Sequence, residues 1–175
     1  VYNKPMSQIK VDSIVPRGGL PSGANGGIIQ VVQSFKTDEF TFTTTGVTSF
    51  VAITGLSVVI TPQSSSSKIF VSGYVSYNMN NASMNVLRLK RGSTVVGVGT
   101  ETRSTNGIIG STNNSDRYPM LSFQFLDSPA TTSATTYSLE MSKSQNNTMR
   151  INTRGSSTTG GFSACSAITA MEVTT

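Results

Sequence analysis

Apolar and polar residues alternate along most of the chain from residue 28 onward, and a period of two is typical of half-buried β-strands. The segment 67–78 places its isoleucine, its valines and Tyr77 on one face, and the segments 120–127 and 136–142 alternate in the same way. Each is therefore predicted to be a half-buried antiparallel strand. No segment carries the apolar stripe of an amphipathic helix.

Two further segments refine this prediction. In the segment 85–99, Leu87 and Leu89 share one parity and Arg88 and Lys90 the other, and a Gly-Ser pair follows. This pattern predicts a strand, a turn and a second short strand. The segment 49–62 changes phase at Gly55: Val51 and Ile53 share one parity, whereas Leu56, Val58 and Ile60 share the other. A bulge or sharp bend at Gly55 would restore one continuous buried face.

Polar loops separate about eight to ten such strands, which is the number expected of a two-sheet sandwich. The fold predicted is all-β, an antiparallel two-sheet jelly-roll-like sandwich of the TNF/C1q-like type, with an extended N-terminal arm. Its core is expected to contain Ile69, Val71, Val75, Leu87, Leu89, Leu121, Phe123, Phe125, Leu139 and Ile151.

The arm is predicted to comprise residues 1–27, and the sandwich domain residues 28–175. Its second half, "VPRGGLPSGANGG", is rich in glycine and proline, which oppose both a helix and a compact core. A flexible linker is one interpretation. The other is an anchor, because an apolar peptide that cannot fold by itself is suited to another protein's surface or sheet edge. The candidate anchor residues are Ile9, Val11, Ile14, Val15 and Pro16.

The last predicted strand, 166–175, is apolar on both faces: Ile168 lies on one face, and Met171 and Val173 lie on the other. An antiparallel strand of this kind needs cover on its second face, and in a small jelly roll a sister subunit can supply it. We therefore expect a homotrimer, with Ile168, Met171 and Val173 as candidate contact residues.

The composition supports packing against other proteins. Charged residues make up 12% of the chain, against about 25% in ordinary soluble domains, and serine and threonine are abundant. The net charge is +5, but only "RLKRG" (88–92) gathers several basic residues, and it reads as a solvated strand, so no nucleic-acid partner is expected. No apolar run approaches the roughly 20 residues of a membrane span, so no membrane insertion is expected.

The sequence argues against catalysis. The chain has no histidine and a single cysteine, Cys165, which excludes histidine-activated nucleophiles and the common Cys/His metal sites. The acidic residues form no obvious catalytic pair, and the glycine-rich segment 15–27 lacks the Lys-Ser/Thr of a phosphate-binding loop. We expect no enzyme, with no catalytic, cofactor-binding or metal-binding residues.

Four segments together resemble a known group: "KVDSIVPRGGLPSGANGGIIQVVQSFKTDEFT", "TSFVAITGLSVVITPQSSSSKIFV", "LRLKRGSTVVGVG" and "SAITAMEV". They are similar to small jelly-roll virion structural and tail-fibre-like proteins of marine cyanophages and related tailed phages. The resemblance implies a trimeric surface appendage on the virion exterior, fixed to capsid or tail proteins by its N-terminal peptide. It leaves open a tail fibre or knob, a capsid-decorating protein and a role in host attachment, and it carries over no ligand-binding residue.

A carbohydrate-binding module that reads host surface glycans through its loops is the alternative, and it is compatible with the first interpretation. Shallow sugar sites generally use an exposed aromatic platform, and the chain has no tryptophan. A ring with a polar group is present only in Tyr2, Tyr74, Tyr77, Tyr118 and Tyr137, most of them in or beside predicted strands. A glycan array would separate the two interpretations.

Overall fold

The computed structural model describes residues 27–78, 83–100, 106–110, 119–146, 148–153 and 163–174. Within these ranges the secondary structure consists of strands, in two antiparallel sheets and without a helix, as predicted. The strands are β1 (Ile28–Lys36), β2 (Phe40–Phe42), β3 (Gly46–Ile60), β4 (Lys68–Asn78), β5 (Ser83–Arg91), β6 (Thr94–Val96), β7 (Asn106–Gly110), β8 (Met120–Asp127), β9 (Thr135–Lys143), β10 (Met149–Ile151) and β11 (Ser166–Val173). Three of them, β2, β6 and β10, have only three residues each, and so short a strand cannot be recognised from the alternation of apolar and polar residues.

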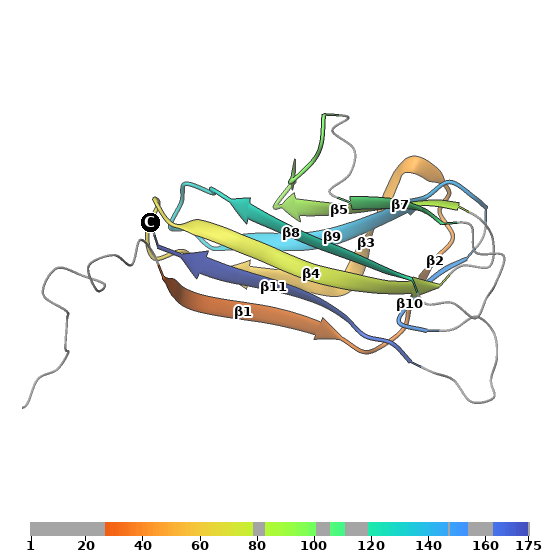
Figure 1. The fold of residues 1–175 in the computed structure, drawn as a ribbon, viewed down its shortest axis with the longest axis horizontal. Coiled ribbons are helices and arrows are strands. Elements are labelled where there is room, and N and C mark those ends of the chain that lie inside the picture. Colours follow the sequence, from red (N-terminus) through yellow and green to blue (C-terminus); the bar gives the residue numbers. More distant parts are fainter. Residues whose placement is uncertain are drawn as a thin grey trace, which may run out of the picture.

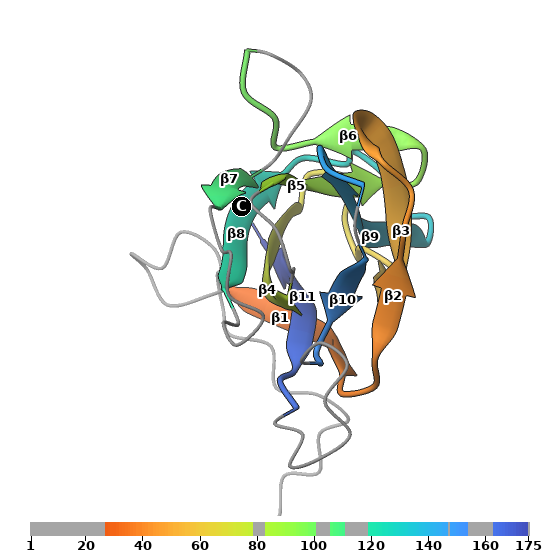
Figure 2. The ribbon, with the colours of Figure 1, turned by 90° about the vertical axis from the view of Figure 1, so that its right-hand side faces the viewer.

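The first sheet has the order β8-β4-β11-β1, and β10 and β2 extend it past the end of β11. The second sheet has the order β3-β9-β5, with β6 and β7 both paired to β5. Figure 1 shows β8, β4, β11 and β1 side by side in one layer, and Figure 2 shows the second layer facing it. From β2 to β5 and again from β7 to β10, each successive strand lies in the other sheet, as in the jelly-roll-like sandwich that was predicted.

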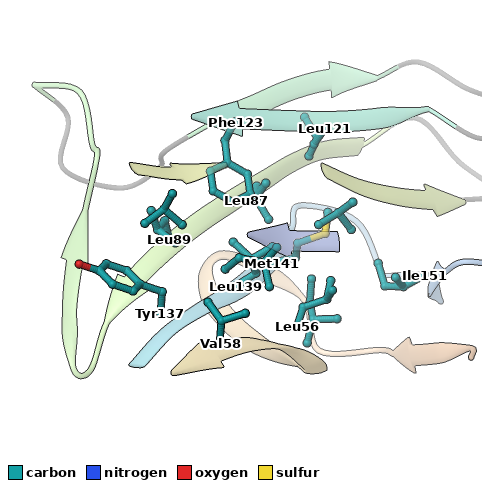
Figure 3. Close-up of a cluster of buried hydrophobic side chains, with 14 of the residues drawn as sticks. Leu56, Val58, Leu87, Leu89, Leu121, Phe123, Tyr137, Leu139, Met141 and Ile151 are labelled. Atoms are coloured by element: carbon teal, nitrogen blue, oxygen red, sulfur yellow. The ribbon is translucent and has the colours of Figure 1, made fainter. Parts of the chain in front are cut away.

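The core lies between the sheets. Figure 3 shows Leu121 and Phe123 of β8 directed toward Leu87 and its neighbours from the second sheet. The predicted core residues are buried, with one exception: Phe125 is only half-buried. It belongs to β8, which is the edge strand of its sheet, and its ring lies over Gly97, where an added Cβ would be 3.0 Å from the Phe125 Cγ.

The phase change in β3 is a bulge, as predicted. Ala52 pairs with Glu140 and Ser57 with Ser138, so that extra β3 residues lie between two β9 positions only two apart. Gly55 has a φ of 88°, a left-handed conformation that favours glycine. The Ser34 hydroxyl donates a 2.6 Å hydrogen bond to the Gly55 carbonyl. The bulge therefore links the edge strands β1 and β3 of the two sheets.

A buried polar cluster fixes β11 between β1 and β4. The Asn152 side-chain nitrogen donates a 2.9 Å hydrogen bond to the Lys36 carbonyl, and the Ser166 hydroxyl donates to Asn152 Oδ1 at 2.6 Å. The same hydroxyl accepts a hydrogen bond from the Ser76 amide at 3.0 Å. Lys36 is the last residue of β1, Ser166 is the first residue of β11, and Ser76 lies near the end of β4, so the cluster joins three neighbouring strands of the first sheet at this end.

A second polar cluster joins the sheets at the other end of β8. Asp127 accepts hydrogen bonds from Arg91 Nη1 at 2.8 Å and from the Tyr137 hydroxyl at 2.6 Å. Arg91 and Tyr137 lie on β5 and β9 of the second sheet. Burial raises the pKa of the Tyr137 phenol, and its hydrogen bond to Asp127 raises it further. The phenol thus stays a donor to Asp127 over the physiological pH range.

Candidate assembly surface

The outer face of the first sheet consists of in-register rows that cross all four long strands. Val31 on β1 pairs with Met171 on β11, Met171 pairs with Phe70 on β4, and Phe70 pairs with Leu126 on β8. Side chains at paired positions of an antiparallel sheet point to the same side. We call these four residues the apolar row, since an aliphatic, thioether or aromatic side chain occupies every position from one sheet edge to the other.

The next row is polar but uncharged. It contains Gln33, Thr169, Ser72 and Gln124 in the same strand order. The Gln33 amide nitrogen donates a 2.9 Å hydrogen bond to the Thr169 hydroxyl. The row after it contains Phe35, Ala167, Tyr74 and Ser122, and the Tyr74 hydroxyl lies 3.3 Å from Cys165 Sγ.

Much of the apolar surface on this face is open to solvent. Val31 is 56% exposed, Phe35 56% and Leu126 47%, whereas Phe70 and Met171 in the middle of the apolar row are half-buried. Contiguous exposed apolar surface of this kind marks interaction sites more often than isolated apolar residues do. The face is therefore the candidate functional site.

The same face is almost free of charge. Among the described outward positions of β1, β11, β4 and β8, Lys68 at the end of β4 is the only charged residue. Lys36 and Glu172, the other charged residues of β1 and β11, are buried. The Lys36 ammonium is 2.6 Å from Asp38, and a Glu172 carboxylate oxygen accepts a 2.7 Å hydrogen bond from the Gln63 amide.

The outer face of the second sheet is charged and internally paired. Glu140 accepts hydrogen bonds from Arg88 and from Lys90, the latter at 3.1 Å, and the Arg88 guanidinium lies 3.8 Å from the centre of the Phe50 ring. Burial raises the pKa of the Glu140 carboxyl, but the hydrogen bonds from Arg88 and Lys90 outweigh it and hold the pKa below 4.5. With Arg91 paired to Asp127, every basic residue of "RLKRG" has a carboxylate partner.

The predicted site residues fall in three places. The anchor candidates Ile9, Val11, Ile14, Val15 and Pro16 lie outside the described residues. Ile168 is fully buried in the core of its own chain, opposite Gly73. Met171 and Val173 are half-buried on the outer face of the first sheet.

Sequence reasoning named only the β11 residues of this face and missed Val31, Phe35, Phe70 and Leu126. One signal was available in "IIQVVQSF", where β1 carries apolar residues at both parities, as β11 does. Phe70 and Leu126 were harder to assign, since Phe70 is flanked by the core residues Ile69 and Val71 and only the strand order places Phe70 and Leu126 in one row.

Few other described residues offer site chemistry. The described part of the chain contains no group of three or more acidic or cysteine side chains that could hold a metal ion, and no helix that could span a membrane. Lys143 is buried, and its ammonium donates to the Thr43 and Gln145 carbonyls at 3.0 Å. Burial lowers its pKa, and its contacts hold the turn before β3. This lysine thus has a structural role.

The described tyrosines do not form an exposed aromatic platform. Tyr77 and Tyr137 are buried in the core and Tyr74 is half-buried, while Tyr2 and Tyr118 lie outside the described residues. A shallow hollow of about 440 Å³ opens beside β8, and its described lining, Ser122, Phe123 and Gln124, carries no charge. No specific observation therefore favours the carbohydrate-binding alternative.

Comparisons with known proteins assign no family. No protein-family model and no curated protein matches the chain. A structure of the infectious bursal disease virus Gx strain is 14% identical over 83% of this chain, with a TM-score of 0.41. The VP2 subviral particle of the same virus is 12% identical over 82% of this chain, with a TM-score of 0.37. The chain spans 40% and 39% of the lengths of these two structures, and similarity at this level assigns no function.

Proposed function

We propose that the chain is a structural protein of a phage virion, a trimeric appendage on the particle exterior that is anchored to capsid or tail proteins by its arm, residues 1–27. The observation that carries the proposal is the outer face of the first sheet, where an apolar row crosses four strands of a sandwich with very few charges. Such a face suits a protein whose role is assembly. The face alone does not say which assembly the chain joins, and the resemblance of four sequence segments to small phage virion proteins points to a phage particle.

The described residues also support a non-enzymatic role. The carboxylates Asp127 and Glu140 are each engaged by cationic or phenolic partners and hold strands together. The buried Lys143 caps backbone carbonyls in the same way. The polar groups with the most distinctive environments are thus explained by the fold, and none of them faces the apolar row.

The arm is proposed as the attachment element on the ground of its sequence. Ile9, Val11, Ile14 and Val15 give it an apolar segment, and the glycines and prolines that follow oppose both a helix and a compact core. Binding by an apolar peptide that does not form a core by itself is a common way to add to a sheet edge or groove.

A chain that begins at Gly27 tests the proposal. It should fold and self-associate like the full chain but fail to join particles when it is supplied during phage assembly. Its matched partner is a full-length chain with Ile9, Val11, Ile14 and Val15 replaced by serine, which should show the same loss. Immunoblots of purified particles give the measurement. Normal incorporation of both variants would contradict the anchoring role.

A further inference from the structure

We propose that a second copy of this same chain covers the outer face of the first sheet, with the apolar row at the centre of the contact. This inference rests on the proposed function, because it identifies the surface through which the trimer forms. Met171 lies in the middle of that row, between Val31 and Phe70. The contact would therefore join two of the predicted trimer residues, Met171 and Val173, to the exposed residues of the edge strands, while Ile168 stays in the core.

Charge argues for a copy of the chain as the occupant. The chain carries a net charge of +5, so two copies repel one another wherever their charged surfaces approach. A different, acidic partner would be recognised through exposed cations, and the described outward positions of β1, β11, β4 and β8 offer only Lys68. An almost uncharged face is the surface on which identical cationic chains can meet with the least repulsion.

The apolar row and the polar row of one copy can each form favourable contacts with the same rows of a second copy. Apolar groups of one copy can pack on those of the next, since Val31 and Leu126 expose apolar surface at opposite edges of the sheet. The polar row has an amide at each edge, Gln33 and Gln124, and an amide both donates and accepts hydrogen bonds. The same row can thus supply both halves of a hydrogen-bonded contact.

The size of the face is sufficient. Four strands spaced by about 4.8 Å, with about eight residues each at about 3.3 Å per residue, measure about 19 by 26 Å. That area is about 500 Å² per copy, so two copies bury about 1,000 Å², the lower limit for a specific interface. Contacts at this limit need a well-packed apolar centre, which the apolar row provides.

A pair of matched variants of the full chain tests the inference. Val31 on β1 and Val59 on β3 are both valines, both 56% exposed, and both on the edge strands of their sheets. Val31→Glu places a charge in the apolar row, whereas Val59→Glu places the same charge on the outer face of the second sheet. Analytical ultracentrifugation at several micromolar concentrations gives the oligomeric state, and circular dichroism gives the folded fraction.

We expect the parent and Val59→Glu to sediment as oligomers and Val31→Glu to sediment as a monomer, with its association weakened about a hundredfold or more because a buried unpaired charge is costly. Leu126→Glu, at the opposite end of the apolar row, should behave like Val31→Glu and decides the matter if the latter does not fold. A monomeric parent, an oligomeric pair of row variants, or equal dissociation of Val59→Glu would overturn the inference.

A further variant separates this contact from an arm that covers the face. The full chain with serine at Ile9, Val11, Ile14 and Val15 should remain oligomeric. If it becomes monomeric, the arm is the occupant and a second sandwich is not. These measurements use purified protein without phage, so failure of the inference and failure of the particle-anchoring proposal are seen in different experiments.

Discussion

The outer faces of the two sheets differ in whether their side chains find partners within the same chain. On the second sheet, Glu140 lies between Arg88 and Lys90, and Arg88 stacks on Phe50, so each charged group has a partner on its own face. On the first sheet, the apolar row ends at two edges in valine and leucine side chains that are about half exposed. The charged groups named on the second sheet are paired within the chain, whereas the first sheet exposes apolar side chains at both edges.

This difference is built from the same strand pattern. Both sheets contribute aliphatic and aromatic residues to one common core, with buried polar residues such as Glu172 and Asp127 near the strand ends. The middle of the outer faces differs, because β5 and β9 place Arg88 opposite Glu140 while β11 and β4 place Met171 beside Phe70. Two sheets that share one core can therefore carry outer faces of different chemistry.

The largest expected effect is on stability, and it distinguishes an inward from an outward side chain of the same strand, β8. Phe123 points into the core and Leu126 points outward on β8. Phe123→Ala should lower the free energy of unfolding by about 3 to 5 kcal/mol, because it leaves a cavity between the sheets. Leu126→Ala should weaken self-association and leave the unfolding of the isolated chain almost unchanged. Thermal and urea melts at low protein concentration give the comparison, and a Phe123→Ala chain that melts like the parent would show that the inward register of β8 is wrong.

A smaller effect is expected where β11 approaches β4. A Cβ added at Gly73 would lie 2.3 Å from the Ala167 carbonyl oxygen, which is backbone and cannot rotate away. Gly73→Ala should therefore cost about 1 to 3 kcal/mol of stability by forcing the two strands apart. Because the displaced strand carries Met171, self-association should weaken as well.

Gly99→Ala is the matched control, since nothing lies within 4 Å of its added Cβ. Urea melts and sedimentation of both variants make the measurement. Equal stability of the two variants would mean that β4 and β11 separate easily at this point, and the first sheet would then be less rigid than its hydrogen bonding indicates.

Sequence reasoning predicted the inner side of the molecule well. The strand positions, the two-sheet class and the bulge at Gly55 followed from alternation and from a single phase change, because burial of one face imposes a period of two. The misplaced detail is Phe125, which shares the inward parity of Leu121 and Phe123 on the edge strand β8 but is only half-buried, with its ring over Gly97. How far along an edge strand the opposite sheet covers it depends on strand order and strand length, and alternation contains no information about either.

The candidate site was only partly predictable for the same reason. Met171 and Val173 were recognised because β11 is apolar at both parities. The apolar row joins residues from four strands that are distant in sequence, such as Val31 and Leu126, and only the order β8-β4-β11-β1 brings them together. The arm residues Ile9 and Val11 lie outside the described residues, so their role stays a prediction.

The smallest effect concerns the paired charges of the second sheet. The pKa of Glu140 is lower in the folded chain than its ordinary value of 4.5, so the folded state binds its proton less readily than the unfolded state does. A carboxylate of this kind contributes stability above about pH 4.5, and that contribution is lost as the pH falls through the lower, folded-state value. Glu140→Gln removes the charge and with it this dependence.

At pH 7 the parent should be more stable than Glu140→Gln by about 1 kcal/mol, a modest value because Arg88 and Lys90 remain partly in contact with solvent. The difference should shrink as the pH falls below 4.5 and should vanish once Glu140 is protonated in both the folded and the unfolded state. Urea melts across this pH range make the measurement, with Glu39→Gln, whose side chain is 47% exposed beside Arg150, as the control of small effect. Self-association of Glu140→Gln at pH 7 should equal that of the parent, because Glu140 lies on the second sheet and the proposed copy contact lies on the first. A variant that dissociates while remaining folded would place the copy contact on the second sheet and reverse the assignment of the two faces.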